Sequence, residues 1–224
     1  MDDPRILFED THLVVIDKPA GLLSQGDISG DHNLVDWLRV YFGRNYVGLV
    51  HRLDRNTSGL MVVAKRSKSA NRLTEALQKG ELKRSYIAIV EGHTHDSKEL
   101  KHFLLKNEST NETRVVKEGT KGAKEARLSY KCFCKTQFEG HAISALHIHL
   151  ETGRGHQIRA QLSHESNPLL GDAKYKSNLS APGRPALHSY NISFPHPMSQ
   201  ELLQFKEPLP KDLLRLLPKD IQWP

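Results

Sequence analysis

The sequence predicts an α+β fold in one domain, with more strands than helices, and three observations support this. Most apolar segments are short runs rich in Val, Ile, Leu and Tyr, which is typical of buried strands. Four other segments carry apolar residues at helical spacing. No internal repeat, low-complexity tract or clear linker divides the 224 residues. We therefore expect the strands and helices to share one core.

The first half of the chain alternates strand and helix signals. The predicted strands, each bounded by polar or turn-forming residues, are 6–9, 13–16, 46–50, 60–64 and 86–90. Asn33 can cap a first helix that ends at Gly43, and Ser67 or Ser69 can open a second that ends at Gly80. The side chains expected to face the core are Leu34, Leu38, Tyr41, Ala70, Leu73, Ala76 and Leu77.

The second half of the chain is less regular. Residues 92–126 are mostly polar, so we expect loops with short strands there. The elements predicted after them are strands 128–133, 142–150 and 187–194 and helices 155–166 and 212–217. His147 and His149 share one face of their strand. Because no further ligand has suitable spacing, we expect these histidines to face solvent rather than bind a metal.

The composition excludes several classes of protein. Hydrophobic residues make up 38 % of the chain and charged residues 26 %, which predicts a soluble globular protein. No apolar run approaches the roughly 20 residues of a membrane span, and the N-terminus lacks the features of a signal peptide. Cys132 and Cys134 are too close for an ordinary disulfide and have no second pair to complete a zinc site. We expect a reducing, cytoplasmic compartment and no membrane partner.

The charge of the chain favours a polyanionic partner without requiring one. Lys and Arg outnumber Asp and Glu by 32 to 26, which gives a net charge of +6 and a pI near 9.3. The excess is concentrated in residues 65–84, where seven basic residues stand against two acidic ones. This basic block either attracts phosphates or is an ordinary solvated helix face.

Residues 51–60, His-Arg-Leu-Asp-Arg-Asn-Thr-Ser-Gly-Leu, are polar and charged although they lie between two predicted strands. Charges at the rim of a core are costly unless they are paired. One interpretation is an ordinary turn in which Asp54 pairs with Arg52 or Arg55. The other is that the Asp54 carboxylate is placed there for chemistry.

This stretch resembles the catalytic motif HRLDxxTSGL of the RluA-type pseudouridine synthases. Residues 84–92 are similar to the family's KxYxAxVxG motif, with Arg84 where Lys is usual. Residues 152–172 are similar to its TGRxHQIRxxL…P..GD block. Shorter correspondences at 17–21 and 187–197 bracket these motifs, so the likeness runs from about residue 6 to residue 197.

The resemblance implies a fold and an activity. The fold is the pseudouridine synthase fold, a mixed, mostly antiparallel central sheet with flanking helices and an active-site cleft. It would form one catalytic domain over residues 1–224. Many relatives carry an S4-type RNA-binding module in front, which we do not expect here because the first predicted strand already starts at Ile6. The activity is an isomerase that converts specific uridines of structured RNA, ribosomal, transfer or both, to pseudouridine. The resemblance implies RNA as partner, no cofactor, no metal, and a monomer.

The resemblance also implies roles for single residues. Asp54 acts on the ribose, either by attack on C1′ or by removal of the C2′ proton. Tyr86 stacks on the target base, and Arg159 pairs with the catalytic carboxylate. The residues expected to contact RNA are Arg52, Arg154, His156 and Gln157. Arg52 would fill the space that the extracted uridine leaves, and the other three lie at a strand-to-helix junction suited to a phosphate.

Two other classes of function fit the residues less well. A non-catalytic RNA-binding module of the same fold predicts loss of Asp54, Tyr86 or Arg159, and all three are present. A metal-dependent hydrolase that uses His51, Asp54 and other histidines needs a ligand pattern such as two His on one helical turn. The sequence shows none. The isomerase is therefore the function that the sequence favours.

Overall fold

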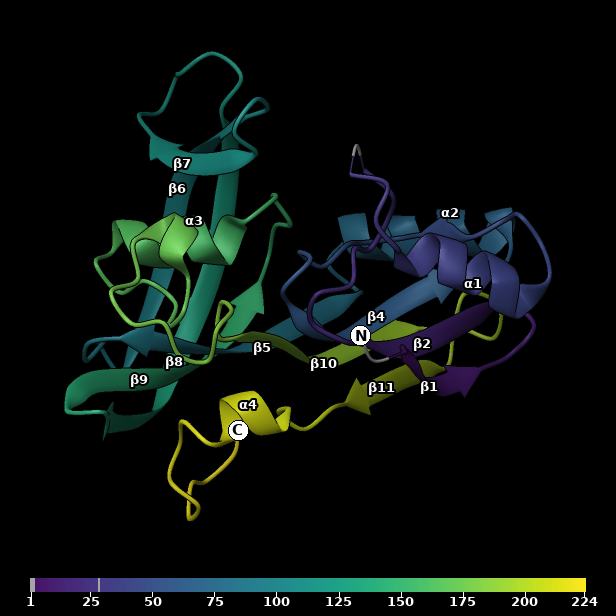
Figure 1. Ribbon diagram of the computed structural model, residues 1–224. Coiled ribbons are helices and arrows are strands. Elements are labelled where there is room, and N and C mark those ends of the chain that lie inside the picture. Colours follow the sequence, from purple (N-terminus) through teal and green to yellow (C-terminus); the bar gives the residue numbers. More distant parts are fainter. Residues whose placement is uncertain (1–2, 28) are drawn as a thin grey trace. The chain divides into compact units, whose positions relative to one another are not determined.

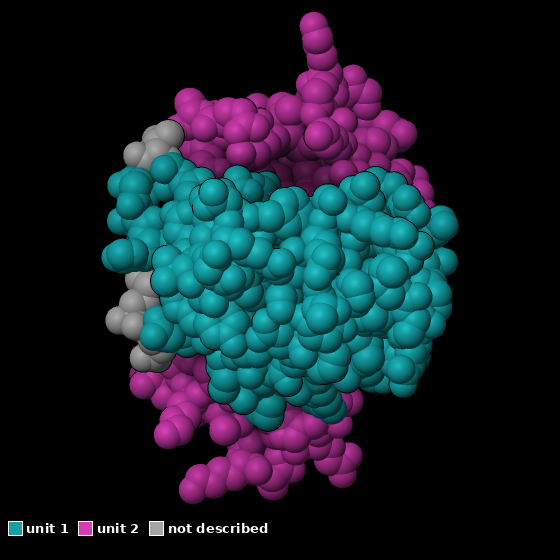
Figure 2. All heavy atoms as spheres, turned by 90° about the vertical axis from the view of Figure 1, so that its right-hand side faces the viewer, with its two compact units in different colours: residues 1–84, 189–208 teal, residues 85–188, 209–224 magenta. Residues whose placement is uncertain are grey.

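A computed structural model describes residues 3–27 and 29–224 of the protein. Two units, each made of two separate segments of chain, are distinguished in Figure 2. Unit 1 holds Met1–Arg84 and Ser189–Pro208, and unit 2 holds Ser85–His188 and Leu209–Pro224. The expectation of one domain over residues 1–224 stays a prediction, because this division does not show whether either unit folds alone.

Unit 1 is a small sheet with two helices. Its strands are β1 (Arg5–Glu9), β2 (Leu13–Lys18), β3 (Gly48–Leu49), β4 (Ser58–Ala64), β10 (Leu187–Pro195) and β11 (Leu202–Lys206). Its helices are α1 (Leu34–Phe42) and α2 (Ser67–Gln78). The strands follow the order β1-β2-β4-β10, with β3 added to β4 and β11 to β10. The predicted hairpin of β1 and β2 and the buried strand β4 are confirmed.

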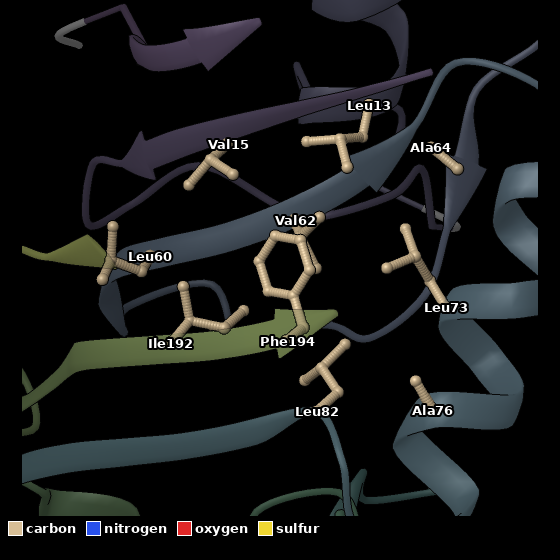
Figure 3. Packing of buried hydrophobic residues seen from close by; sticks show 10 residues of the cluster. All are labelled: Leu13, Val15, Leu60, Val62, Ala64, Leu73, Ala76, Leu82, Ile192 and Phe194. Atoms are coloured by element: carbon tan, nitrogen blue, oxygen red, sulfur yellow. The ribbon is translucent and has the colours of Figure 1, made fainter. Parts of the chain in front are cut away.

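The core of unit 1 lies between its sheet and α2. Figure 3 shows side chains of β2, β4 and β10 meeting Leu73 and Ala76 of α2. Leu13, Leu60 and Phe194 are fully buried in this cluster. Burial of each such side chain contributes about 1.5–3 kcal/mol. This packing fixes β4, the strand that follows the 51–57 segment.

The predicted ends of α1 are confirmed, whereas part of its predicted buried face is wrong. The Oδ1 atom of Asn33 accepts a hydrogen bond from the Asp36 N–H at 3.1 Å, and Gly43 closes the helix with φ 63°. Leu34 and Leu38 are buried, but Tyr41 is 50 % exposed. The Tyr41 hydroxyl donates to a Glu9 carboxylate oxygen at 3.0 Å, which holds the ring at the solvent edge.

One further prediction in unit 1 needs correction. The predicted strand 46–50 shrinks to Gly48–Leu49, and Tyr46 is 41 % exposed. Gly48 packs closely against Ala70: a Cβ atom at position 48 would lie 2.9 Å from the Ala70 Cβ, so only glycine fits there. The predicted start of α2 is confirmed, because the helix begins at Ser67; its N-cap residue, Arg66, makes no side-chain cap.

Unit 2 is built on an antiparallel sheet (Figure 1). Its strands are β5 (Lys83–Glu91), β6 (Ser97–Asn107), β7 (Glu112–Val116), β8 (Lys124–Phe138) and β9 (His141–Leu150). They follow the order β5-β9-β8-β6-β7, and every neighbouring pair is antiparallel. Its helices are α3 (Gln157–His164), the 3₁₀ helix η1 (Ala173–Tyr175) and α4 (Lys211–Leu214). Strands outnumber helices in both units, which confirms the predicted α+β fold.

The expectation of loops with short strands over 92–126 is wrong. β6 and β7 form a hairpin, and β6 continues along β8. The inward face of β6 has only two fully buried leucines, Leu100 and Leu104, four positions apart. The remaining positions are exposed or half-buried, so the period-2 signal of a strand is weak there.

The last predicted helices are shorter than expected. α3 covers Gln157–His164 rather than 155–166, because His156 has a left-handed backbone with φ 55° that an α-helix cannot include. α4 covers Lys211–Leu214 rather than 212–217. Cys132 and Cys134 are free thiols. In the part of the chain that the structure describes, no helix is long and apolar enough to cross a membrane.

Candidate active site

Asp54 lies in the segment that joins β3 to β4 in unit 1. Its carbonyl oxygen accepts a hydrogen bond from the Thr57 N–H at 3.0 Å, which closes a turn. His51 and Leu53 are buried, with 7 % and 6 % of their surfaces exposed, whereas Arg52 is exposed and Asp54 half-buried. The segment thus anchors two side chains in the core and presents Arg52 and Asp54 near the surface.

A buried ammonium group holds this segment. Lys18, the last residue of β2, is fully buried, and its Nζ donates to the carbonyl oxygens of Pro19, Leu22 and Arg55 at 2.8, 2.8 and 3.1 Å. Charged donors make the strongest of such hydrogen bonds. The Arg55 carbonyl oxygen also accepts from the Gly21 N–H at 2.9 Å. The residue that follows Asp54 is therefore fixed to the end of β2.

Two polar side chains complete this attachment. The Ser24 hydroxyl donates to the Leu53 carbonyl at 2.7 Å and accepts from the Leu53 N–H at 3.1 Å. The Arg55 guanidinium binds Asp31 at 2.7 Å and the Gly21 carbonyl at 3.1 Å. Arg55 thus pairs with Asp31 and not with Asp54, as it would in the ordinary turn considered above.

His51 has a structural environment rather than that of a base. Its Nε2 accepts a hydrogen bond from the Val62 N–H at 3.3 Å. Burial, aided by the charge of Arg84, lowers the pKa of His51 to about 3, so the ring is neutral at neutral pH. Among residues 3–27 and 29–224, no three His, Cys, Asp or Glu side chains are grouped as metal ligands would be.

Tyr86 and Arg159 belong to unit 2. Tyr86 lies in β5 opposite Ile148 of β9 and is 4 % exposed. Arg159 lies in α3, and its Nε and Nη2 atoms donate to the two carboxylate oxygens of Asp172 at 2.7 and 2.8 Å. The guanidinium also lies over the Tyr175 ring, 4.8 Å from its centroid. Arg159 is thereby held in one orientation.

The predicted RNA-binding residues at the start of α3 differ in exposure. Arg154 is exposed, and its Nε donates to the Glu125 carbonyl at 2.9 Å. The His156 Nδ1 lies 2.9 Å from the Tyr175 hydroxyl. Gln157 is buried, and its amide binds Thr152, the Arg154 N–H and the Arg127 carbonyl. The burial of Gln157 favours a role in holding this junction over direct contact with RNA.

The basic block 65–84 is not one continuous charged face. Arg84 is buried, and Lys65 pairs with Glu9 at 2.5 Å. Arg72 donates to the Pro197 carbonyl at 2.6 Å. The members of the block that are exposed are Arg66, Lys68, Lys79 and Lys83. For these four residues both alternatives, attraction of phosphates and an ordinary solvated position, stay predictions.

Lys18, Asp172 and Tyr175 hold the candidate site residues, although the sequence alone indicated no such role for them. Lys18 falls in the 17–21 correspondence and Asp172 ends the 152–172 block, so the motifs contained a signal for both. Tyr175 lies outside every motif, and nothing in its local sequence indicates its contacts with Arg159 and His156.

The chain is similar to known RNA pseudouridine synthases. A family profile described as RNA pseudouridylate synthase matches residues 12–164. The Bacillus subtilis protein named "Uncharacterized RNA pseudouridine synthase YjbO" is 35 % identical over 223 residues, covering 95 % of this chain and 75 % of that protein. "Ribosomal large subunit pseudouridine synthase D" of Nitrosomonas europaea is 36 % identical over 232 residues, covering 95 % of this chain and 64 % of that protein.

Solved structures show a similar fold. "Human RNA Pseudouridylate Synthase Domain Containing 1" superposes with a TM-score of 0.77 at 22 % identity. The superposition covers 93 % of this chain and 84 % of that chain. This chain therefore shares its fold with most of that chain.

Proposed function

Because this chain belongs to the RluA-type family of RNA pseudouridine synthases, we propose that it isomerises specific uridines of structured RNA through the carboxylate of Asp54. Membership makes it an isomerase with the pseudouridine synthase fold, as the sequence analysis predicted. The observation that carries the proposed role of Asp54 is its setting. The carboxylate is half-buried, in a turn whose flanking residues are fixed by Lys18 and Ser24.

The reaction detaches the uracil from its ribose and attaches it again through a different atom. The N1–C1′ bond breaks, the uracil turns, a C5–C1′ bond forms, and the proton on C5 leaves while N1 gains one. An ionised Asp54 can attack C1′, or it can remove the C2′ proton so that a glycal forms. Asp54 has one of these two roles, and neither route includes a step that needs a cofactor or metal.

Three other residues are proposed to assist. Tyr86 stacks on the target uracil, and Arg159 pairs with the Asp54 carboxylate and favours its charged form. The bidentate contact with Asp172 supports this role, because it fixes the direction of the Arg159 guanidinium. Arg52, which is exposed two residues before Asp54, fills the space left by the extracted nucleotide.

We propose ribosomal RNA as the substrate, with transfer RNA as the alternative. The Nitrosomonas europaea relative is named for the large ribosomal subunit, which supports the first choice. The two free thiols fit a reducing, cytoplasmic setting. We also infer that the enzyme acts as a monomer on a target recognised by local RNA shape.

The test is tritium release from RNA labelled at C5 of uridine. Ribosomal and transfer RNA made without pseudouridine are incubated with the enzyme in Mg²⁺, with and without 1,10-phenanthroline, which removes transition metals but leaves Mg²⁺. We expect release from ribosomal RNA, unchanged by the chelator. Release from transfer RNA alone would refute the substrate choice. Tight binding of both RNA pools without release would refute catalysis.

A further inference from the structure

A basic groove lies at the N-terminus of α2 in unit 1. Its volume is about 540 Å³, and its wall includes His12, Tyr46, Arg66, Lys68 and Ser69. No Asp or Glu lines it. Lys65, which also lines the groove, pairs with Glu9. Among the described residues, neither Arg66 nor Lys68 has an ion pair, so these two positive charges are uncompensated.

The helix end that opens into this groove is uncapped. The N-cap residue of α2, Arg66, makes no side-chain hydrogen bond to the helix, and its first turn contains no acidic residue. The first N–H groups of a helix have no partner within it, and the helix dipole adds positive potential there. A twelve-residue helix of this kind favours an anion at its N-terminus.

A buried hydroxyl gives an independent indication of a ligand. Ser69 is 1 % exposed and lines the groove, and its Oγ has no hydrogen-bond partner among the described residues. His12, which directly precedes β2, lines the same groove, and its Nδ1 atom is likewise buried without a partner among the described residues. Buried polar atoms are seldom left without a partner, and an anion with several acceptor oxygens can receive a hydrogen bond from each group.

The surroundings of the groove fit a nucleotide better than a free ion. Tyr46 is 41 % exposed and lines the groove, so an aromatic side chain on which a base could stack is part of the same wall. A second hollow of about 380 Å³ shares Lys65 and Arg66 with it and is also lined by Arg44 and by Glu9, the partner of Lys65. The Nε and Nη2 atoms of Arg44 are buried without partners in the described structure. Positive groups thus continue along the surface beyond the helix end.

We propose that this groove binds a backbone phosphate of the RNA substrate, with the phosphate on the N–H groups of residues 67–69 and a neighbouring nucleoside on Tyr46. The proposal rests on the proposed function in that it takes RNA as the substrate. The phosphate binds at the N-terminal end of α2 only. Lys79, which is exposed at the C-terminal end of the helix, does not contact it.

The test uses fluorescence anisotropy of a labelled twelve-nucleotide oligouridylate across a range of salt concentrations. We expect Lys68→Ala to lower the slope of log affinity against log salt by about 1. Lys68→Glu should weaken binding about tenfold, because it also places a carboxylate beside the phosphate. The matched control is Lys79→Glu, which changes the net charge equally on the same helix and should weaken binding less than about twofold.

A third variant tests the buried wall of the groove. Ser69→Ala removes a hydroxyl without an internal partner, so its melting temperature should not fall, whereas binding should weaken about threefold. Equal losses for Lys68→Glu and Lys79→Glu, or unchanged binding by Ser69→Ala, would overturn the proposal. Binding needs no turnover. If the variants show these binding losses but the wild-type enzyme releases no tritium, the isomerase is refuted and the phosphate site is still supported.

Discussion

Arg159 holds Asp172 through two parallel hydrogen bonds of 2.7 and 2.8 Å, and both side chains are buried. The two residues are joined across the turn that follows α3. Arg159 therefore has its direction set within unit 2 by a residue that ends the same sequence block. This pair is the support on which the proposed role of Arg159 depends.

We expect Asp172→Asn to cost about 3 kcal/mol of unfolding free energy, because it leaves the Arg159 charge buried beside a neutral partner. The rate of tritium release should fall as well, since Arg159 loses its fixed direction. Urea denaturation and single-turnover kinetics measure the two effects. The control is Asp212→Asn, which breaks the less buried pair with Arg184 and should cost no more than about 1 kcal/mol. Equal costs for both variants would contradict the account.

Lys18→Met should destabilise the protein by about 2 kcal/mol or more, although the replacement is apolar and similar in length. The change leaves the carbonyl oxygens of Pro19, Leu22 and Arg55 without their donor. Because the residue after Asp54 is then no longer anchored, kcat should fall more than RNA affinity. Lys79→Met, at an exposed lysine, is the control and should change stability by less than about 0.5 kcal/mol. A kcat equal to that of the wild type would show that the anchor is not needed.

Gly59→Ala tests the close approach of β4 to β10. Gly59 has φ 110°, and a Cβ atom there would lie 2.3 Å from the Ser189 carbonyl oxygen. Gly80 also has a positive φ, 73°, but a Cβ there would meet nothing within 4 Å. We expect Gly80→Ala to cost about 1 kcal/mol from backbone strain alone, and Gly59→Ala to cost about 1–3 kcal/mol more. Thermal unfolding compares them, and equal losses would disprove the clash.

The neutral state of His51 predicts a pH dependence of stability. Its folded pKa of about 3 lies below the ordinary value of 6.5. The unfolded chain therefore takes up the proton first, and stability is lost as the pH falls from about 6.5 towards 3. The loss should approach about 1.4 kcal/mol per pH unit. His51→Gln cannot titrate, so its unfolding free energy should fall less steeply between pH 6.5 and pH 4.5. Identical slopes would show that His51 is not buried neutral.

The parts of the fold that were predictable are those in which local sequence and tertiary contacts agree. All seven residues of β4 are buried, so its continuous apolar run identified the strand. Asn33 and Gly43 mark the ends of α1 through contacts within a few residues. By contrast, β6 has only two fully buried leucines, and its pairing with β8 depends on residues far along the chain.

The residues that hold the candidate site could not be predicted from the sequence for a similar reason. Lysine is almost never fully buried, so nothing local indicated that Lys18 would donate to a carbonyl 37 positions away. Arg84 counted as part of a charged surface, but it is buried. The motif residues themselves were identified because the family resemblance gives their positions directly. What the motifs omit is the set of long-range contacts that hold them.

The most direct test of the account is tritium release by Asp54→Asn from ribosomal RNA labelled at C5 of uridine. The matched control is Asp31→Asn, which neutralises a carboxylate that pairs with the adjacent Arg55. Asp54→Asn should keep its melting temperature and RNA affinity but release tritium at no more than the background rate. Asp31→Asn should retain most of the wild-type rate. Release by Asp54→Asn at the wild-type rate would contradict the central role of this carboxylate.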